Sequence, residues 1–265
     1  MSESVGGASA PMWETCAYPG SRLKCRGPVR QLDGDFIAVM GGAETLSAHL
    51  SRDVAQVIEA TTGVSCVNFS AAHAGPAAYL SDPGLLMQIA RARAVVLSIP
   101  GAHLARNALF QVHSRRNDRV IGQSSSLRAL YPEVDFISHP FVRHMLIEME
   151  RVSKTRFAVV RDALRKGWCA GMADLIAAAD APVYGLWLGQ RDPEELTDSI
   201  EAADPPLVGR DMLNALNLSG LVEVTRKPCE EDHALPQADV IKQAGRAVAR
   251  MLNDETMPKS LRRTA

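Results

Sequence analysis

The sequence predicts an α/β protein: one three-layer αβα sandwich with about five mostly parallel strands. Three observations support this fold class. Continuous apolar runs, as expected for strands buried on both faces, alternate with segments of helical spacing. These runs end at glycine, proline or small polar residues. The chain has 265 residues, 46% of them hydrophobic, which suffices for one large core without disulfide bonds.

The first half of the predicted domain contains three strands. Residues 36–40 are a continuous apolar run that ends in two glycines, and residues 64–69 and 94–99 are predicted as two further short strands. Apolar residues at helical spacing predict a helix over residues 46–60 between the first two strands. Residues 85–92 predict another helix before the third strand, which Pro100 and Gly101 stop.

The second half starts with an Arg- and His-rich insertion at about residues 106–150, in which Ser124 is a candidate N-cap for a short helix at 127–131. Residues 156–179 form the longest helical pattern, and we expect Trp168 and Met172 on it to pack in the core. Strands are predicted at 182–188 and 221–225, and helices at 210–216 and 238–252.

This pattern predicts that the chain is divided into three segments. Residues 1–33, rich in Gly, Pro, Ser and Arg without periodicity, predict an N-terminal arm laid over the core. Residues 34–256 form the single α/β domain, and residues 257–265 a polar tail.

Charge and composition exclude several classes of protein. Lys+Arg 29 against Asp+Glu 30 leaves a net charge of −1, so we expect no nucleic-acid partner. No apolar run reaches the roughly 20 residues of a membrane span, and the start lacks the pattern of a secretion signal. The five cysteines, at 16, 25, 66, 169 and 229, have no zinc-site spacing. We expect a cytoplasmic protein with reduced thiols, no bound metal and no cofactor.

Candidate binding residues follow the first three predicted strands. In a parallel sheet the ligand crevice lies beyond the carboxyl ends of the strands. Gly42 follows the first strand, Asn68 and His73 the second, and Gly101 and Asn107 the third. Each exit therefore offers glycine for a close backbone approach and a polar side chain that can face a ligand, although Asn107 can equally tie down its own loop.

The order of these exits resembles the blocks of the SGNH (GDSL-like) hydrolases. The resembling pattern is strand-Gly-x-x-x-Thr-helix, then Asn and Gly separated by six residues, then Gly and Asn separated by five. The resemblance implies an SGNH- or flavodoxin-like fold. It also implies a Ser nucleophile after the first strand, with Gly and Asn donors forming an oxyanion hole.

The chain resembles more closely an uncharacterised group of alphaproteobacterial proteins of the DUF6473 type. The resemblance rests on a Gly-Gly-x-Glu-Thr turn at residues 41–45, a Gly-Ala-x-x-x-x-Asn segment at 101–107 and a His-x-Arg-Arg-Asn-Asp-Arg run at 113–119. Residues 134–146 and the arm at 18–28 also match, so the resemblance covers roughly residues 18 to 190. It implies no particular activity.

The sequence departs from the hydrolase pattern at the nucleophile. Ala43 stands where the resemblance places the serine, and alanine has no nucleophile. The candidate catalytic residues are therefore Thr45, Glu44 and His233. Thr45, the only hydroxyl in the turn, either reacts or bonds to backbone, and Glu44 serves as an acid or base or favours a helix N-terminus. His233 either replaces the expected histidine, since Leu235 occupies that place, or is a solvated loop residue.

Residues 113–119, which we call the arginine run, are the strongest local feature. Guanidinium forks suit sulfate, phosphate or carboxylate groups. Alternatively, Asp118 and Asp135 pair with the arginines and pin the insertion to the sheet. The candidate ligand-binding residues here are His113, Arg115, Arg116, Asp118 and Arg119, followed in the insertion by Arg143 and His144.

Three hypotheses of function remain open. In the first, an SGNH-like enzyme or degenerate relative of esterases and acyltransferases binds or acts on an anionic or acylated carbohydrate. In the second, a non-catalytic or structural protein on the same fold binds a small polar or anionic ligand such as a glycan. In the third, a transferase uses an activated sulfate or nucleotide donor. Ala43 favours binding or degenerate catalysis.

Overall fold

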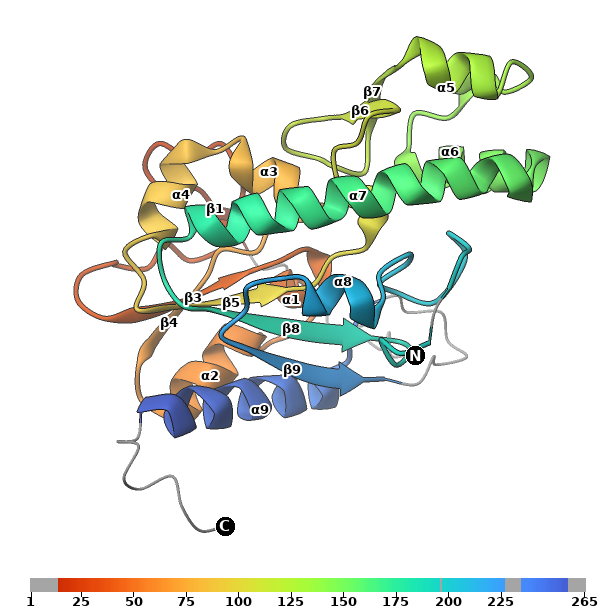
Figure 1. The fold of residues 1–265 in the computed structure, drawn as a ribbon. Helices are drawn as coiled ribbons and strands as arrows, with labels where there is room; N and C mark the ends of the chain where they lie inside the picture. Colours follow the sequence, from red (N-terminus) through yellow and green to blue (C-terminus); the bar gives the residue numbers. More distant parts are fainter. Residues whose placement is uncertain (1–13, 196, 227–234, 257–265) are drawn as a thin grey trace, which may run out of the picture.

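The computed structural model describes residues 14–195, 197–226 and 235–256, and its centre is a five-stranded parallel sheet (Figure 1). The strands are β3 Phe36–Met40, β4 Ser65–Asn68, β5 Ala94–Ser98, β8 Val183–Gly189 and β9 Gly220–Thr225. Their order is β4-β3-β5-β8-β9, with every neighbouring pair parallel. All five predicted strands are therefore present, in the doubly wound order of flavodoxin-like proteins.

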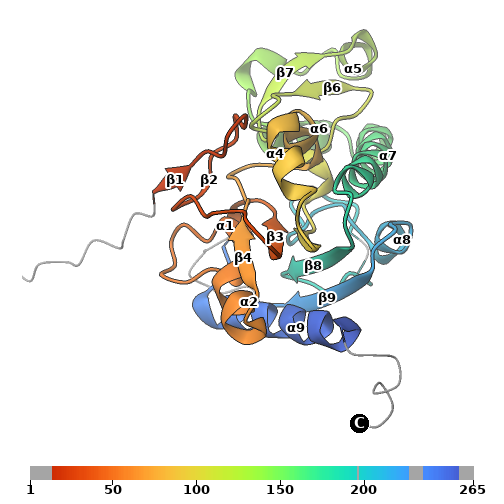
Figure 2. The same cartoon turned by 90° about the vertical axis from the view of Figure 1, so that its left-hand side faces the viewer.

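Helices cover both faces of the sheet, which confirms the three-layer sandwich. One face carries α2 Val54–Thr62 and α9 Ala238–Thr256, below the sheet in Figure 1. The other carries α3 Pro76–Leu80, α4 Pro83–Ile89, α7 Lys154–Ala178 and α8 Arg210–Asn214. Figure 2 shows the same layers along the sheet.

The continuous apolar runs have a simple cause in this arrangement. Successive side chains of a strand point to opposite faces. Along β3, Ile37 and Val39 pack with α2 and α9, whereas Phe36, Ala38 and Met40 pack with the opposite layer. Because β3 is covered on both sides, each of its five positions is apolar. On α7, Trp168 and Met172 are fully buried in this core, as predicted.

The helix predicted over residues 46–60 is confirmed only from residue 54 onward, because residues 47–53 are not helical. A short helix, α1 Ala43–Leu46, ends at Ser47, whose φ is 48°. The buried Arg26 donates hydrogen bonds of 2.7 Å to the carbonyls of Leu46 and Ser47 and so holds this turn. A new helix, α2, starts after Asp53, whose side chain caps it by accepting from Gln56 N.

The arm is bound closely to the core from residue 14 onward. It contains a small antiparallel pair, β1 Thr15–Cys16 and β2 Cys25–Arg26. Arg26 forms a buried ion pair of 2.5 Å with Asp53. Between the two strands, one carboxylate oxygen of Asp82 accepts hydrogen bonds from the backbone N–H groups of Arg22 and Leu23.

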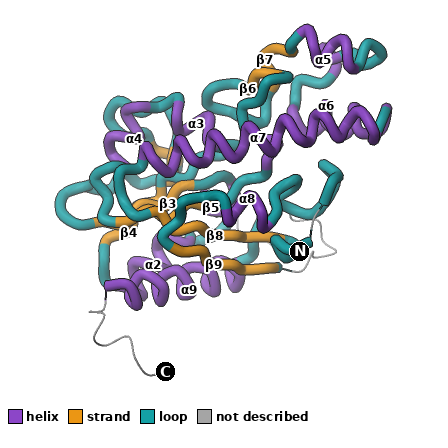
Figure 3. Tube along the Cα trace, in the orientation of Figure 1, coloured by secondary structure: helices purple, strands orange, loops and turns teal. Residues whose placement is uncertain are grey.

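The insertion has more structure than the one short helix predicted there. It forms a hairpin of β6 Phe110–Val112 and β7 Val120–Gln123, then α5 Ser125–Leu130 and α6 Val142–Val152 (Figure 3). The missed helix α6 buries Val142, Met145, Leu146 and Met149, which have regular helical spacing. The polar residues between them concealed this pattern.

Two further results bear on the composition-based predictions. Cys16, Cys25, Cys66 and Cys169 are free thiols, and Cys229 lies outside the described residues. Within the described part of the chain, no helix is long and apolar enough to span a membrane. The predicted tail at 257–265 and the first thirteen residues of the arm also fall outside the description.

Candidate functional site

The exits of β3, β4 and β5 meet at the carboxyl edge of the sheet, where the chain order reverses between β3 and β5. Two cavities lie there. We call the larger one, of about 630 Å³, the main cavity. Its charged and imidazole side chains are Glu44, Asp118, Asp204, Arg116, Arg143, Arg226, His73, His103 and His144. Ile99, Leu104, Phe141, Leu188 and Leu235 add an apolar part to its wall.

Glu44 is held in place at the start of α1. Its Oε1 accepts a hydrogen bond of 2.9 Å from Gly42 N and one of 2.8 Å from the hydroxyl of Ser98. Ser98 ends β5 and is only 1% exposed, so it supports the carboxylate from below. The other oxygen, Oε2, accepts no hydrogen bond from the described residues. Glu44 therefore presents a fixed carboxylate to the main cavity.

Thr45 and Asn68 lie behind this site and line neither cavity. The hydroxyl of Thr45 is fully buried and lies 2.8 Å from that of Ser70. The amide of Asn68 donates to the carbonyl of Thr45 and accepts from Ser70 N. These bonds join the exits of β3 and β4, so both side chains shape the floor rather than face a ligand.

The exit of β5 brings a histidine into the main cavity. Gly101 and a short 3₁₀ helix, Ala102–Leu104, place His103 in its wall. The Nδ1 atom of His103 is buried and has no hydrogen-bond partner among the described residues. Removal from water, reinforced by the charge of Arg143, lowers the pKa of His103 to about 3. The ring is therefore neutral at physiological pH.

Asn107 lies outside both cavities. Its carbonyl oxygen accepts from the backbone N–H groups of Leu109 and Phe110, and its amide donates to the Ala105 carbonyl at 3.4 Å. Of the two hypotheses for this residue, the loop-fixing one describes its contacts.

The arginine run is docked on the core by its central asparagine. Asn117 is fully buried, and its Oδ1 accepts from the backbone N–H groups of Gly75 and Ala78 at the start of α3. Its amide donates to the carbonyl of His113 at 3.0 Å. Because Gly75 has no side chain to cap α3, Asn117 supplies the cap from another segment.

The three arginines of the run have different surroundings. Arg116 donates two hydrogen bonds to Asp118, with Nη2 and Oδ2 separated by 2.9 Å. Arg119 lies over the ring of Phe141, 4.4 Å from its centroid. The guanidinium of Arg115 makes no ion pair or hydrogen bond with the described residues. Of the two aspartates in the structural alternative, Asp118 therefore pairs with Arg116, whereas Asp135 bonds to Ser138 and Ile137 N.

Helix α6 contributes the remaining predicted residues. Arg143 forms an ion pair of 3.2 Å with Asp204, and both line the main cavity. His144 is exposed and packs edge-on against Phe141, with ring centroids 5.7 Å apart.

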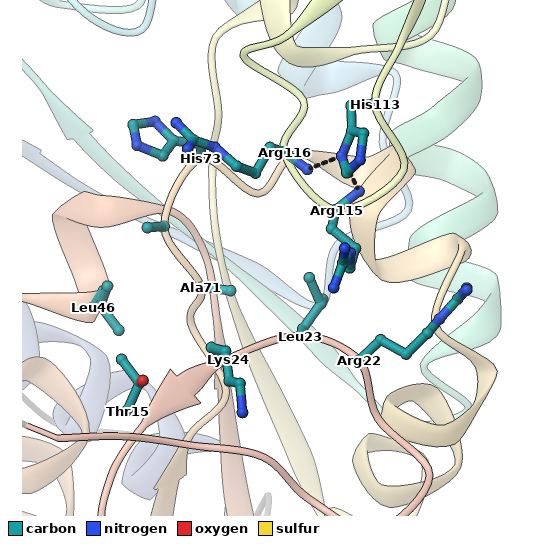
Figure 4. A pocket seen from close by; sticks show the side chains of 11 residues that line it. Thr15, Arg22, Leu23, Lys24, Leu46, Ala71, His73, His113, Arg115 and Arg116 are labelled. Carbon is teal, nitrogen blue, oxygen red and sulfur yellow. Dashed lines mark hydrogen bonds between the residues drawn. The ribbon is translucent and has the colours of Figure 1, made fainter. Parts of the chain in front are cut away.

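A second cavity of about 460 Å³, which we call the basic cavity, lies between the arm and the arginine run. His73, His113, Arg115 and Arg116 line it together with Arg22 and Lys24 of the arm (Figure 4). His73 and Arg116 line both cavities and form their common wall. Most of the predicted ligand residues thus line one or both of two adjacent cavities, whereas Asn68, Asn107 and Arg119 line neither. His233 lies outside the described residues.

A family model for a domain of unknown function, DUF6473, matches residues 1–261. The chain belongs to the DUF6473 family. The resemblance to this family is thus confirmed, and it extends beyond residues 18 to 190. Comparisons with curated proteins and with solved structures gave no match.

Several residues of this DUF6473 protein that shape the site were missed by sequence reasoning. Arg226 follows β9 and lines the main cavity, so the strand-exit rule applied to the fifth strand identifies it. Arg191 follows β8, but it is buried and donates to the carbonyls of Glu195, Pro205 and Val208. It therefore fixes the loop that carries Asp204. No local sequence pattern shows that Arg226 lines a cavity whereas Arg191 holds a loop.

Proposed function

We propose that this DUF6473 protein is an SGNH-like protein whose main cavity binds an anionic or acylated carbohydrate-type ligand without a hydroxyl nucleophile of its own. The doubly wound sheet and the glycine turn after its first strand support the relationship. Ala43 lines the main cavity next to Gly42, at the place that the resemblance gives to the serine.

One observation carries the proposal: Arg116, Arg143 and Arg226 surround a cavity that also contains the fixed carboxylate of Glu44. Guanidinium groups recognise a carboxylate or sulfate bidentately, and a carboxylate oxygen accepts hydrogen bonds from sugar hydroxyls. The apolar part of the wall, such as Leu188, suits the face of a sugar ring or an acyl chain. An acidic sugar has all three chemical features, and an acyl group on it adds to the apolar one.

The lining also limits the chemistry. Among the described residues, the main cavity has no Ser, Thr, Cys, Lys or Tyr side chain in its wall. A covalent acyl-enzyme therefore lacks its usual nucleophiles. Serine-directed fluorophosphonate is expected to leave the protein unlabelled, and stoichiometric labelling of a serine would overturn the proposed alignment. Ala43→Ser gains weak esterase activity only if a histidine such as His233 lies within hydrogen-bond reach.

A second candidate function is acid–base catalysis on the same ligand without a covalent intermediate. The anchoring of Glu44 by Gly42 N and Ser98 favours it, because a general base must be held close to the proton it removes. Glu44→Gln keeps the shape and removes the base. If the protein is only a binder, this variant changes affinity alone, whereas loss of turnover of an acylated sugar at unchanged affinity indicates catalysis.

Binding can be tested by calorimetry with a uronic-acid oligosaccharide and its neutral counterpart. We expect only the acidic sugar to bind, and Arg143→Gln to weaken its binding by about tenfold or more, since a charged hydrogen bond contributes about 1.5–3 kcal/mol. Arg93→Gln is the matched control, because Arg93 is exposed before β5, at the opposite edge of the sheet. Equal binding of both sugars, or equal loss in both variants, contradicts the proposal.

A further inference from the structure

The basic cavity has a strongly one-sided charge. Arg22, Lys24, Arg115 and Arg116 line it, and no Asp or Glu among the described residues does so. His73 and His113 add two imidazoles. The main cavity, by contrast, balances three arginines with three carboxylates. The chain as a whole is nearly neutral, so this concentration of cations is local.

Most of these cations are available to a ligand. Arg115 and Lys24 are exposed and make no side-chain hydrogen bond or ion pair with the described residues. The guanidinium of Arg22 donates one hydrogen bond, to the carbonyl of Ser81 at 2.8 Å, and forms no ion pair with the described residues. Of the arginines and the lysine, Arg116 alone has a carboxylate partner among the described residues, Asp118, whose Oδ2 also lies 3.6 Å from His73 Nδ1. That carboxylate lines the main cavity and not the basic one.

The backbone that carries these cations is fixed on both sides. On the arm, Asp82 accepts from the N–H groups of Arg22 and Leu23, and an isolated β-bridge joins Cys25 to Ala71. On the arginine run, the buried Asn117 and the His113 ring hold the turn, since His113 Nδ1 accepts from the next two arginine N–H groups. The fold therefore keeps these like charges close together before a ligand binds. Such preorganisation reduces the entropy that is lost when an anion binds.

The floor between the cations is apolar. Leu23, Leu46 and Ala71 line it, and Figure 4 shows Leu23 between the side chains of Arg115, Arg22 and Lys24. An apolar floor reduces the screening of charges by water and so strengthens their attraction for an anion. The volume of about 460 Å³ is in the range of small-molecule sites.

We infer that the basic cavity is a binding site for a phosphate-type anion, in particular a diphosphate group. Cations approach from two separate segments, so the ligand must carry more than one negative charge and present oxygens in several directions. A diphosphate does so, and it pairs with arginine forks and with the point charge of a lysine. A single carboxylate has too few oxygens to reach both sides.

The site stands apart from the proposed function of the main cavity, because Arg115, Lys24 and Arg22 do not line that cavity. The common wall of His73 and Arg116 places a diphosphate next to the main cavity. A diphosphate ester bound here extends either into the main cavity or towards solvent.

Calorimetric titration with inorganic pyrophosphate, a nucleoside diphosphate and sulfate tests the inference. We expect pyrophosphate to bind more tightly than sulfate, and Arg115→Gln and Lys24→Gln each to weaken its binding about tenfold or more. Arg93→Gln again serves as the control and retains affinity. Tighter binding of the nucleoside diphosphate identifies an organic ester as the ligand, whereas equal binding identifies the inorganic anion, and both outcomes support the site.

Absence of pyrophosphate and nucleoside diphosphate binding overturns the inference. So does an equal loss of affinity in Arg93→Gln, since it assigns the binding to diffuse surface charge. The same Arg115→Gln protein is titrated with the acidic oligosaccharide. If this variant still binds the sugar but no longer binds pyrophosphate, the two ligands occupy different cavities. If the sugar binds neither the original protein nor any variant, the proposal for the main cavity is contradicted and the one for the basic cavity is not.

Discussion

Asn117 connects the arginine run to the core, and its replacement by alanine is the sharpest test of how the site is built. The change removes the acceptor for the buried N–H groups of Gly75 and Ala78 and the donor for the His113 carbonyl. A buried backbone group left without a partner costs about 1–3 kcal/mol. We therefore expect Asn117→Ala to lower the free energy of unfolding by about 3–5 kcal/mol.

Urea-induced unfolding followed by circular dichroism measures this loss, and in a thermal scan the midpoint should fall on the order of 10 °C. Asn214→Ala is the matched control, because Asn214 is exposed at the end of α8 and its loss should cost at most about 0.5 kcal/mol. A stability of Asn117→Ala within about 1 kcal/mol of the original protein would refute the claim that this residue anchors the run.

Three further predictions concern buried groups. Asp53→Ala leaves the Arg26 guanidinium buried without its counter-charge, and denaturant unfolding should show a loss of about 3–5 kcal/mol; unchanged stability would contradict this. The pKa of His103 is lowered from 6.5 to about 3 in the folded protein. Between these two pH values the His103 ring binds a proton in the unfolded chain but not in the folded one, so the free energy of unfolding falls as the pH drops from 6.5 to 3. The fall should be smaller in His103→Gln, and the NMR signal of the His103 ring should stay constant from pH 8 to pH 5. Burial raises the pKa of Cys25 and Cys66, so peptide mass spectrometry after iodoacetamide treatment should find both alkylated in urea and unmodified in the native protein.

The positions of the main strands along the chain could be predicted, because burial on two faces leaves little choice of residue. Residues 36–40 are apolar at every position for this reason, and the structure places β3 at the same residues. The break between α1 and α2 could not be predicted, because the turn at Ser47 is bound by Arg26, which is far away in the sequence and donates to the carbonyls of Leu46 and Ser47. A helical pattern does not reveal such a long-range contact.

The sequence predicted the candidate site at the carboxyl edge of the sheet, but it did not show which residues there face a cavity. The rule that ligands bind beyond strand ends directed attention to Glu44 and His73, and the structure places both in the wall of the main cavity. It could not distinguish Glu44 from Thr45, one residue away, because their directions depend on the turn of α1 and on Ser98 and Ser70 beneath it. The contribution of Lys24 was invisible, since the arm has no periodic pattern to place it.

The common wall of His73 and Arg116 has a thermodynamic consequence. Occupancy of one cavity alters the charge that the wall presents to the other, since an anion on either side competes with Asp118 for the Arg116 guanidinium. The total binding free energy does not depend on which cavity is filled first. A ligand in the main cavity therefore changes the affinity of the basic cavity by the same factor by which a ligand in the basic cavity changes the affinity of the main cavity. A two-ligand titration performed in both orders must therefore give the same coupling constant.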